Sequence, residues 1–177
     1  MEIEELEREI ARLHEVSFAW ALACCGWRSQ EAEDVLQSAY VKVLSGRARF
    51  GGHSTLKTWL FGVIRNTARE ERRRALFRRL RLLPLAEQEE PAVEPRAEHE
   101  AETNERSSQL ATALGALARR QREVLELVFA HGMTIEQAAC TLGVSLGAAR
   151  VHYERGKRRL RGQLGGHAAS VRKAVTR

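Results

Sequence analysis

The chain has 177 residues, room for one large domain or two small ones, and a formal net charge of +6 that favours a polyanionic partner. No apolar run approaches the roughly 18 residues of a membrane span, and the acidic start MEIEELEREI is unlike a secretory signal, so we expect a cytoplasmic protein without direct membrane insertion. Cys24, Cys25, Cys140 and the six histidines show no metal-ligand spacing, which predicts buried thiols, no metal and no cofactor.

Helical periodicity dominates the first part of the chain. Residues 3–26 form one expected helix, and Ser29 is expected to cap a second helix that Gly46 ends. The apolar face of that second helix consists of Ala32, Val35, Leu36, Ala39, Val43 and Leu44. After the basic loop RARFGGHS, Ser54 is expected to cap a third helix. The apolar side of its first half contains Leu56, Trp59, Leu60, Val63 and Ile64.

Two blocks of opposite charge follow one another. Residues 65–81 contain eight arginines and only two glutamates, whereas residues 84–105 contain eight glutamates, one arginine and all three prolines. The acidic block has almost no large apolar side chain, so burial cannot offset the entropy of ordering it. We therefore expect an arginine-rich helix followed by a flexible acidic linker.

A second helical block begins at Ser107 or Ser108 and contains the pattern of a helix-turn-helix. Thr134 and Gln137 have capping-box spacing, Gly143 suits a tight turn, and Ser145 is placed to cap the next helix. The apolar face between cap and turn consists of Ile135, Ala138, Ala139 and Leu142. The alternative is an ordinary helical hairpin with a solvated basic face.

The helix after Ser145 is strongly basic. Six arginines and lysines lie between residues 150 and 161, against the single acid Glu154. The early residues of such a helix reach base edges in a major groove. Arg150 is the best candidate for a guanine contact, whereas Lys157 and Arg158 suit phosphates. The pattern predicts a reader of duplex DNA.

Three segments occur in a fixed order around the acidic block: AEDVLQSAYVKVL at 32–44, RFGGHSTLKTWLFGVIRNTAREERRR at 49–74, and a long stretch at 118–161 that contains the helix-turn-helix. Together they resemble a bacterial RNA polymerase sigma factor of the extracytoplasmic-function (ECF) group. The resemblance implies an all-α fold, with two small helical domains on a flexible acidic linker. The expected limits are 1–83 for the second sigma domain, 84–106 for the linker, 107–165 for the fourth sigma domain and 166–177 for a basic tail.

The resemblance also implies three sets of functional residues. Those expected to bind the clamp helices of the polymerase β′ subunit are Asp34, Val35, Gln37, Ser38, Tyr40, Val41 and Leu44. Those expected to melt and read the −10 promoter element are Phe50, His53, Ser54, Lys57, Arg65, Asn66, Arg69, Arg72 and Arg73. Those expected at the −35 element are Ser145, Gly147, Ala148, Arg150, Val151, Glu154, Arg155, Lys157 and Arg158.

The expected partners are core RNA polymerase, through its β′ clamp and β flap, promoter DNA, and an anti-sigma factor that is commonly membrane-anchored in this family. The protein would act in transcription initiation without chemistry of its own. One alternative is a helix-turn-helix regulator that is not a polymerase subunit, but no strand pattern of an α/β receiver is seen. An enzyme is the other, but no phosphate-binding glycine loop, metal cluster or nucleophile–base set is visible.

Overall fold

The structure is a computed structural model that describes residues 3–82, 110 and 112–175. The described residues form helices and loops without a strand, which confirms the all-α prediction. They fall into two compact units: one contains α1 to α4, and the other contains α6, most of α7 and α8. Each unit is described by itself. The expected acidic linker at 84–106 lies outside the described residues, as does the expected start of the second block.

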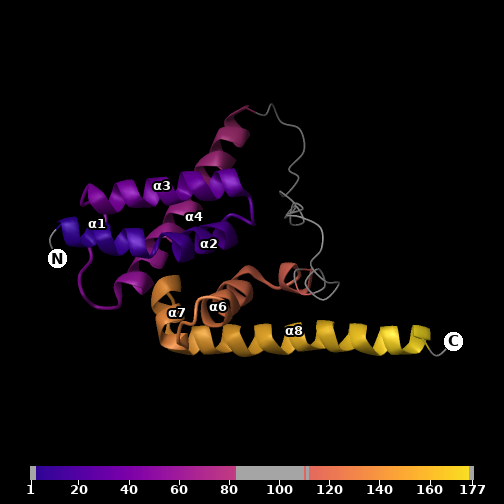
Figure 1. Ribbon diagram of the computed structural model, residues 1–177. Coiled ribbons are helices and arrows are strands. Elements are labelled where there is room, and N and C mark those ends of the chain that lie inside the picture. The colour runs from indigo at the N-terminus through magenta and orange to yellow at the C-terminus, as the bar shows by residue number, and fades with distance from the viewer. Residues whose placement is uncertain (1–2, 83–109, 111, 176–177) are drawn as a thin grey trace. The chain divides into compact units, whose positions relative to one another are not determined.

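Helices α1 (Ile3–Arg12), α2 (His14–Cys24), α3 (Ser29–Leu44) and α4 (Leu56–Leu82) build the first unit. Helix α2 packs against both α3 and α4, and α4 runs across the pair (Figure 1). The single helix expected over 3–26 is instead two helices, because the backbone leaves helical geometry at Leu13, where ψ is 1°. A turn with positive φ at Gly26 and Trp27 then leads into α3.

The core of this unit centres on Trp20 of α2. Its ring stacks on that of Phe61 in α4 with centroids 5.8 Å apart, and its indole N–H donates to the Phe61 carbonyl at 3.0 Å. Helix α3 adds its predicted apolar face, with Ala32, Val35, Leu36, Ala39 and Val43 all buried. Leu44, the last residue predicted for that face, is 39% exposed because it ends the helix.

Two of the predicted helix caps are wrong. Helix α3 is preceded by Arg28 in extended conformation, and the Ser29 hydroxyl donates to the Glu33 carboxylate at 3.3 Å instead of capping the backbone. Helix α4 begins after Thr55, whose Oγ1 accepts the backbone N–H of Thr58 at 3.2 Å. Ser54 lies one residue too far from the first turn for that bond. At the start of α4, the adjacent hydroxyl residues Ser54 and Thr55 therefore left the predicted cap position ambiguous by one residue.

The second unit contains a short helical stretch at 112–115, then α6 (Arg119–Phe129), α7 (Ile135–Leu142) and α8 (Leu146–Val175). Helix α6 packs on α8, and its Val124, Leu125 and Leu127 are buried. Gly156 allows this close approach, because a Cβ atom there would lie 3.1 Å from both the Gln121 Cβ and the Leu125 Cδ1 atoms. An added side chain at that position would require these neighbours to shift by a few tenths of an ångström.

Helix α8 is longer than the sequence predicted. Its 30 residues correspond to a length of about 45 Å. Helical backbone continues to Val175, through most of the stretch expected to be a basic tail. Two glycines at 165–166 lie within this helix, since glycine lowers helix propensity by only about 1 kcal/mol and does not forbid helical backbone.

Candidate nucleic-acid interface

The turn between α7 and α8 has the geometry that the sequence predicted. The backbone N–H of Thr134 donates to the Gln137 side chain at 2.9 Å, and the N–H of Gln137 donates back to the Thr134 hydroxyl at 3.2 Å. Gly143 has a φ of +60°, which suits a residue without a Cβ atom. The Ser145 hydroxyl accepts the N–H of Ala148 at 3.2 Å and thereby caps α8. These bonds fix how the basic helix leaves the turn.

One face of α8 is exposed near this turn. The side chains of Arg150 and Glu154 are each 61% exposed and Val151 is 46% exposed, whereas Ala149 is fully buried. Four more residues of the expected −35 set are exposed: Ser145, Gly147, Arg155 and Arg158. Ala148 is half-buried. The start of α8 therefore presents a polar, largely cationic surface of a shape that suits a major groove.

The guanidinium of Arg150 has a partner on the preceding helix. Its Nη2 lies 3.4 Å from the Oε1 atom of Glu136, in the first turn of α7. The pKa of Glu136 is held below its usual range by its own backbone N–H, by the Thr134 side chain and by Arg150. Sequence reasoning missed Glu136, because no local pattern pairs residues 14 apart across a turn.

Lys157 occupies a different environment on α8. Its ammonium lies 3.3 Å from the Glu154 carboxylate and 4.8 Å from the centroid of the Tyr153 ring, which in turn stacks on Phe129 of α6. The side chain is only 28% exposed. The charge of Lys157 is therefore held against an aromatic ring, where it adds positive potential from a fixed position.

The residues expected at the −10 element lie on α4 and in the loop before it. Those on α4 are Lys57, Arg65, Asn66, Arg69, Arg72 and Arg73. Arg72 also donates from Nη2 to the Cys24 carbonyl at 2.7 Å, so it helps to hold the end of α2. In the loop, the Phe50 ring lies 5.4 Å from that of Trp59, which supports a packing role for Trp59, while His53 is exposed and Ser54 half-buried.

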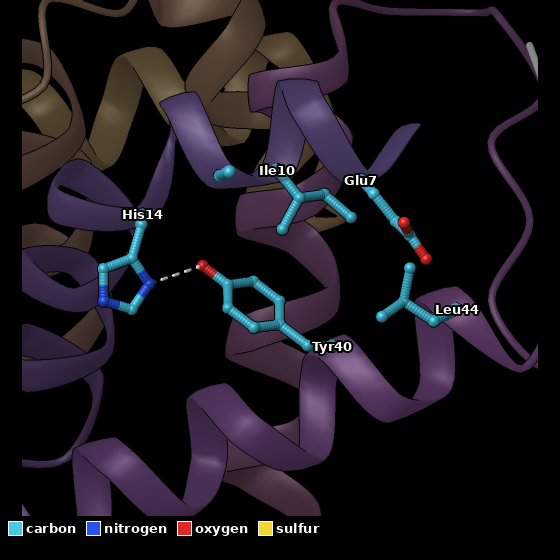
Figure 2. Close-up of a pocket in the computed structure, with 6 residues that line it drawn as sticks. Glu7, Ile10, His14, Tyr40 and Leu44 are labelled. Carbon is cyan, nitrogen blue, oxygen red and sulfur yellow. Dashed lines mark hydrogen bonds between the residues drawn. The ribbon is translucent and has the colours of Figure 1, made fainter. Parts of the chain in front are cut away.

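Helix α3 carries the residues expected to bind polymerase. Asp34, Gln37, Val41 and Leu44 are exposed, Ser38 and Tyr40 are half-buried, and Val35 is in the core at 3% exposure. Next to them is an open pocket whose lining, shown in Figure 2, consists of Glu7, Ile10, Ala11, His14, Tyr40 and Leu44. The Tyr40 hydroxyl lies 3.3 Å from the Nδ1 atom of His14. Burial raises the pKa of Tyr40, against a smaller lowering by its hydrogen bond with Ser17.

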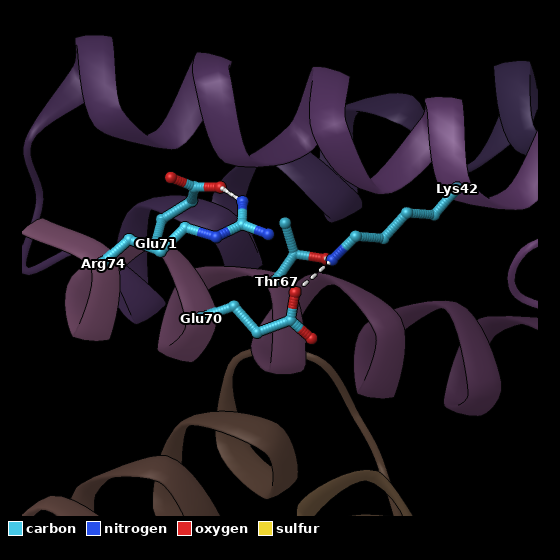
Figure 3. Close-up of polar contacts among 5 residues, drawn as sticks. All are labelled: Lys42, Thr67, Glu70, Glu71 and Arg74. Atoms are coloured by element: carbon cyan, nitrogen blue, oxygen red, sulfur yellow. Dashed lines mark hydrogen bonds and ion pairs between the residues drawn. The ribbon is translucent and has the colours of Figure 1, made fainter.

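A polar bridge ties this helix to the arginine-rich helix. The ammonium of Lys42 in α3 lies 2.7 Å from the Glu70 carboxylate and 3.0 Å from the Thr67 hydroxyl in α4 (Figure 3). The nearby pair between Arg74 and Glu71, also 2.7 Å, stays within α4. The bridge links the helix expected to bind polymerase to the helix expected to bind DNA.

Two further properties concern only the described residues. None of their helices is both long and apolar enough to cross a membrane. Nor do these residues bring three or more histidine, cysteine, aspartate or glutamate side chains together as metal ligands.

Comparison with known proteins gives a consistent family. The model of Sigma-70 region 2 matches residues 11–77, and the model of Sigma-70 region 4 matches residues 107–160. The sigma factor CarQ of Myxococcus xanthus is 30% identical over 134 residues, which cover 76% of this chain and 75% of CarQ. The ECF sigma factor SigE of Mycolicibacterium smegmatis is 28% identical over 141 residues; these are 80% of this chain but only 54% of SigE, about half its length.

A solved structure agrees with these sequences. The sigma factor RpoE in complex with the anti-sigma factor NepR from Bartonella quintana superposes with a TM-score of 0.69 at 25% identity, over 92% of this chain and 98% of that one. The two matched sigma regions lie on either side of the acidic block. The chain belongs to the RNA polymerase sigma factors, within the ECF group.

Proposed function

We propose that this chain binds core RNA polymerase and directs it to specific promoters, with the polymerase supplying all the chemistry. The main support is that one chain has two exposed surfaces of different character. One is the basic face of the capped helix-turn-helix, and the other is the apolar and acidic surface of α3. A promoter-specific subunit needs both surfaces, since one must hold the enzyme while the other reads DNA. The alternative, a regulator outside the polymerase, leaves the α3 surface without a use.

The proposal assigns each surface a target. The exposed residues of α3, with Asp34 and Val41 among them, bind the β′ clamp, and α4 with its preceding loop meets the −10 element as single-stranded DNA. The start of α8 reads the −35 element as duplex, and the second unit also contacts the β flap. The proposed domain limits are 1–83 and 107–165, joined by 84–106 and followed by a basic tail at 166–177.

We further propose that the protein acts in the cytoplasm, where chromosome and polymerase are found, under the control of an anti-sigma factor. The RpoE structure, solved with NepR, supports control of this kind. An inhibitor that covers α3 and the start of α8 together would block enzyme and DNA binding at once. We expect the partner to be membrane-anchored, as is common in this family.

The direct test is transcription in vitro with purified core polymerase and this chain. The template is the promoter upstream of its own gene, and the comparison is core polymerase alone. We expect initiation at a defined start site only when the chain is present. If the chain instead binds duplex DNA without core polymerase and redirects no initiation, the alternative regulator is correct.

Control by an inhibitor needs a separate test. The protein is purified from its native cells before and after envelope stress, and the stoichiometry of associated proteins is measured. We expect an equimolar partner from a neighbouring gene, released on stress. Full activity in unstressed cells with no stoichiometric partner would contradict this part of the proposal.

A further inference from the structure

The ion pair between Glu136 and Arg150 joins the two helices of the helix-turn-helix on the exposed surface. Arg150 Nη2 and Glu136 Oε1 are 3.4 Å apart, and both side chains are more than half exposed, at 61% and 58%. Exposed pairs of this kind add at most a small increment to folding stability, because water screens them. The pair with Arg150 therefore contributes little to folding, although it lies beside the surface proposed to approach phosphates.

The position of the carboxylate is itself well defined. Glu136 lies in the first turn of α7, directly after the reciprocal bonds between Thr134 and Gln137 that fix the start of this helix. A negative charge also suits a helix N-terminus. Arg150 lies in the second turn of α8, which begins from the equally well-defined cap at Ser145. Two capped helices thus hold the Glu136 carboxylate and the Arg150 guanidinium within reach of each other.

We infer that Glu136 is a positioning residue that holds the guanidinium of Arg150 toward the base edges and away from the phosphate backbone. An arginine on the groove-facing turn has two competing targets, a guanine edge that confers specificity and phosphates that do not. A carboxylate on the neighbouring helix restrains the flexible side chain and repels nearby phosphates. This inference rests on the proposed reading of the −35 element by α8.

Two variants of Glu136 separate geometry from charge. Glu136→Gln removes the charge and keeps the shape, whereas Glu136→Asp keeps the charge but withdraws it by one methylene. Both variants weaken the hold on Arg150, because glutamine leaves only a neutral acceptor and aspartate places its carboxylate farther away. We expect each to lower discrimination at the base pair read by Arg150 by roughly 3- to 10-fold, out of a total of about 5- to 150-fold for a good bidentate contact. Only Glu136→Gln should also bind all promoters more tightly.

The measurement uses holoenzyme assembled from core polymerase and the full chain. Competition binding compares the protein's own promoter with variants in which each −35 base pair is substituted in turn, at several salt concentrations. With Glu136→Gln, the slope of log affinity against log salt should steepen by about one, because the released arginine gains a phosphate contact. In the Arg150→Ala background, Glu136→Gln should leave discrimination unchanged.

The outcomes are distinguishable from one another. If wild-type holoenzyme shows no discrimination at any −35 base pair, the proposed reading by α8 is wrong. If the wild type discriminates and both Glu136 variants retain that discrimination in full, the inference is overturned. A loss of affinity that is equal on all promoters would also overturn the inference, because it would show a merely structural effect. So would a loss of discrimination by Glu136→Gln that persists in the Arg150→Ala background. Thermal melting of each free variant confirms that it is folded.

Discussion

At the scale of single residues, Trp20 shows how one side chain joins two helices. It is 1% exposed, stacks on Phe61 and donates its indole N–H to the Phe61 carbonyl. Trp20→Ala should lower the free energy of unfolding by about 3–5 kcal/mol, since truncation of a buried aromatic leaves a large cavity. Urea denaturation of the full chain measures the loss. Phe77→Ala, at a 60% exposed aromatic on α4, is the control and should change stability little.

Tyr40 should make stability depend on alkaline pH. Burial raises its pKa above the ordinary value of about 10, so the unfolded chain loses this proton at lower pH than the folded chain. The stabilisation is therefore complete below the unfolded pKa and is lost as pH rises through the folded pKa. Denaturation at pH values from about 8 to about 11 should show wild type losing more stability than Tyr40→Phe. Equal pH profiles for the two proteins would refute this assignment.

At the scale of elements, the capping box formed by Thr134 and Gln137 stabilises the start of α7, the helix that carries Glu136. Thr134→Ala removes the hydroxyl that accepts the Gln137 N–H and should lower the free energy of unfolding by about 1 kcal/mol. Thr134→Ser keeps the acceptor and serves as the control. Because α7 also carries Glu136, we expect Thr134→Ala to weaken −35 discrimination as well, measured by promoter competition. Retained stability in Thr134→Ala would show that the cap contributes nothing.

The elements also show what the sequence could predict. The caps at Thr134 and Ser145 and the turn at Gly143 were predictable because each depends on residues a few positions apart. Ser29 and Ser54 follow the same rule but failed as caps, because the choice between neighbouring polar residues depends on where tertiary packing starts the helix. The break at Leu13 has no cue from glycine or proline.

The exposure of candidate site residues could be predicted from the sequence, but their contacts with other helices could not. Outward-facing positions such as Asp34 and Arg150 follow from helical period, and the structure exposes both. Contacts across helices do not follow from it. The bridge from Lys42 to Glu70 spans 28 positions, and the pair of Glu136 with Arg150 spans 14. Periodicity shows which face of a helix is exposed, but partners on another helix depend on how the helices cross.

At the scale of the whole molecule, the proposed binding of the β′ clamp and the proposed reading of the −35 element belong to different units. Asp34→Arg reverses a charge on the exposed surface of α3 and should weaken assembly with core polymerase, and so lower transcription from all promoters together. Arg150→Ala should leave assembly intact and lower selectivity at one base pair by roughly 1–3 kcal/mol. Labelled core polymerase measures the first effect and promoter competition the second. A change of −35 preference in Asp34→Arg would contradict the division.

The absence of a side chain at Gly156 has a mechanical consequence for selectivity. Helix α8 packs closely on α6 at this position. Arg150 precedes the contact along α8, and the C-terminal turns of the helix follow it. In Gly156→Ala the added methyl group would lie 3.1 Å from atoms of Gln121 and Leu125, so the packing of the two helices must adjust by a few tenths of an ångström. The proposed choice of promoter therefore depends on the packing of α8 on α6 as well as on the residues expected to contact DNA.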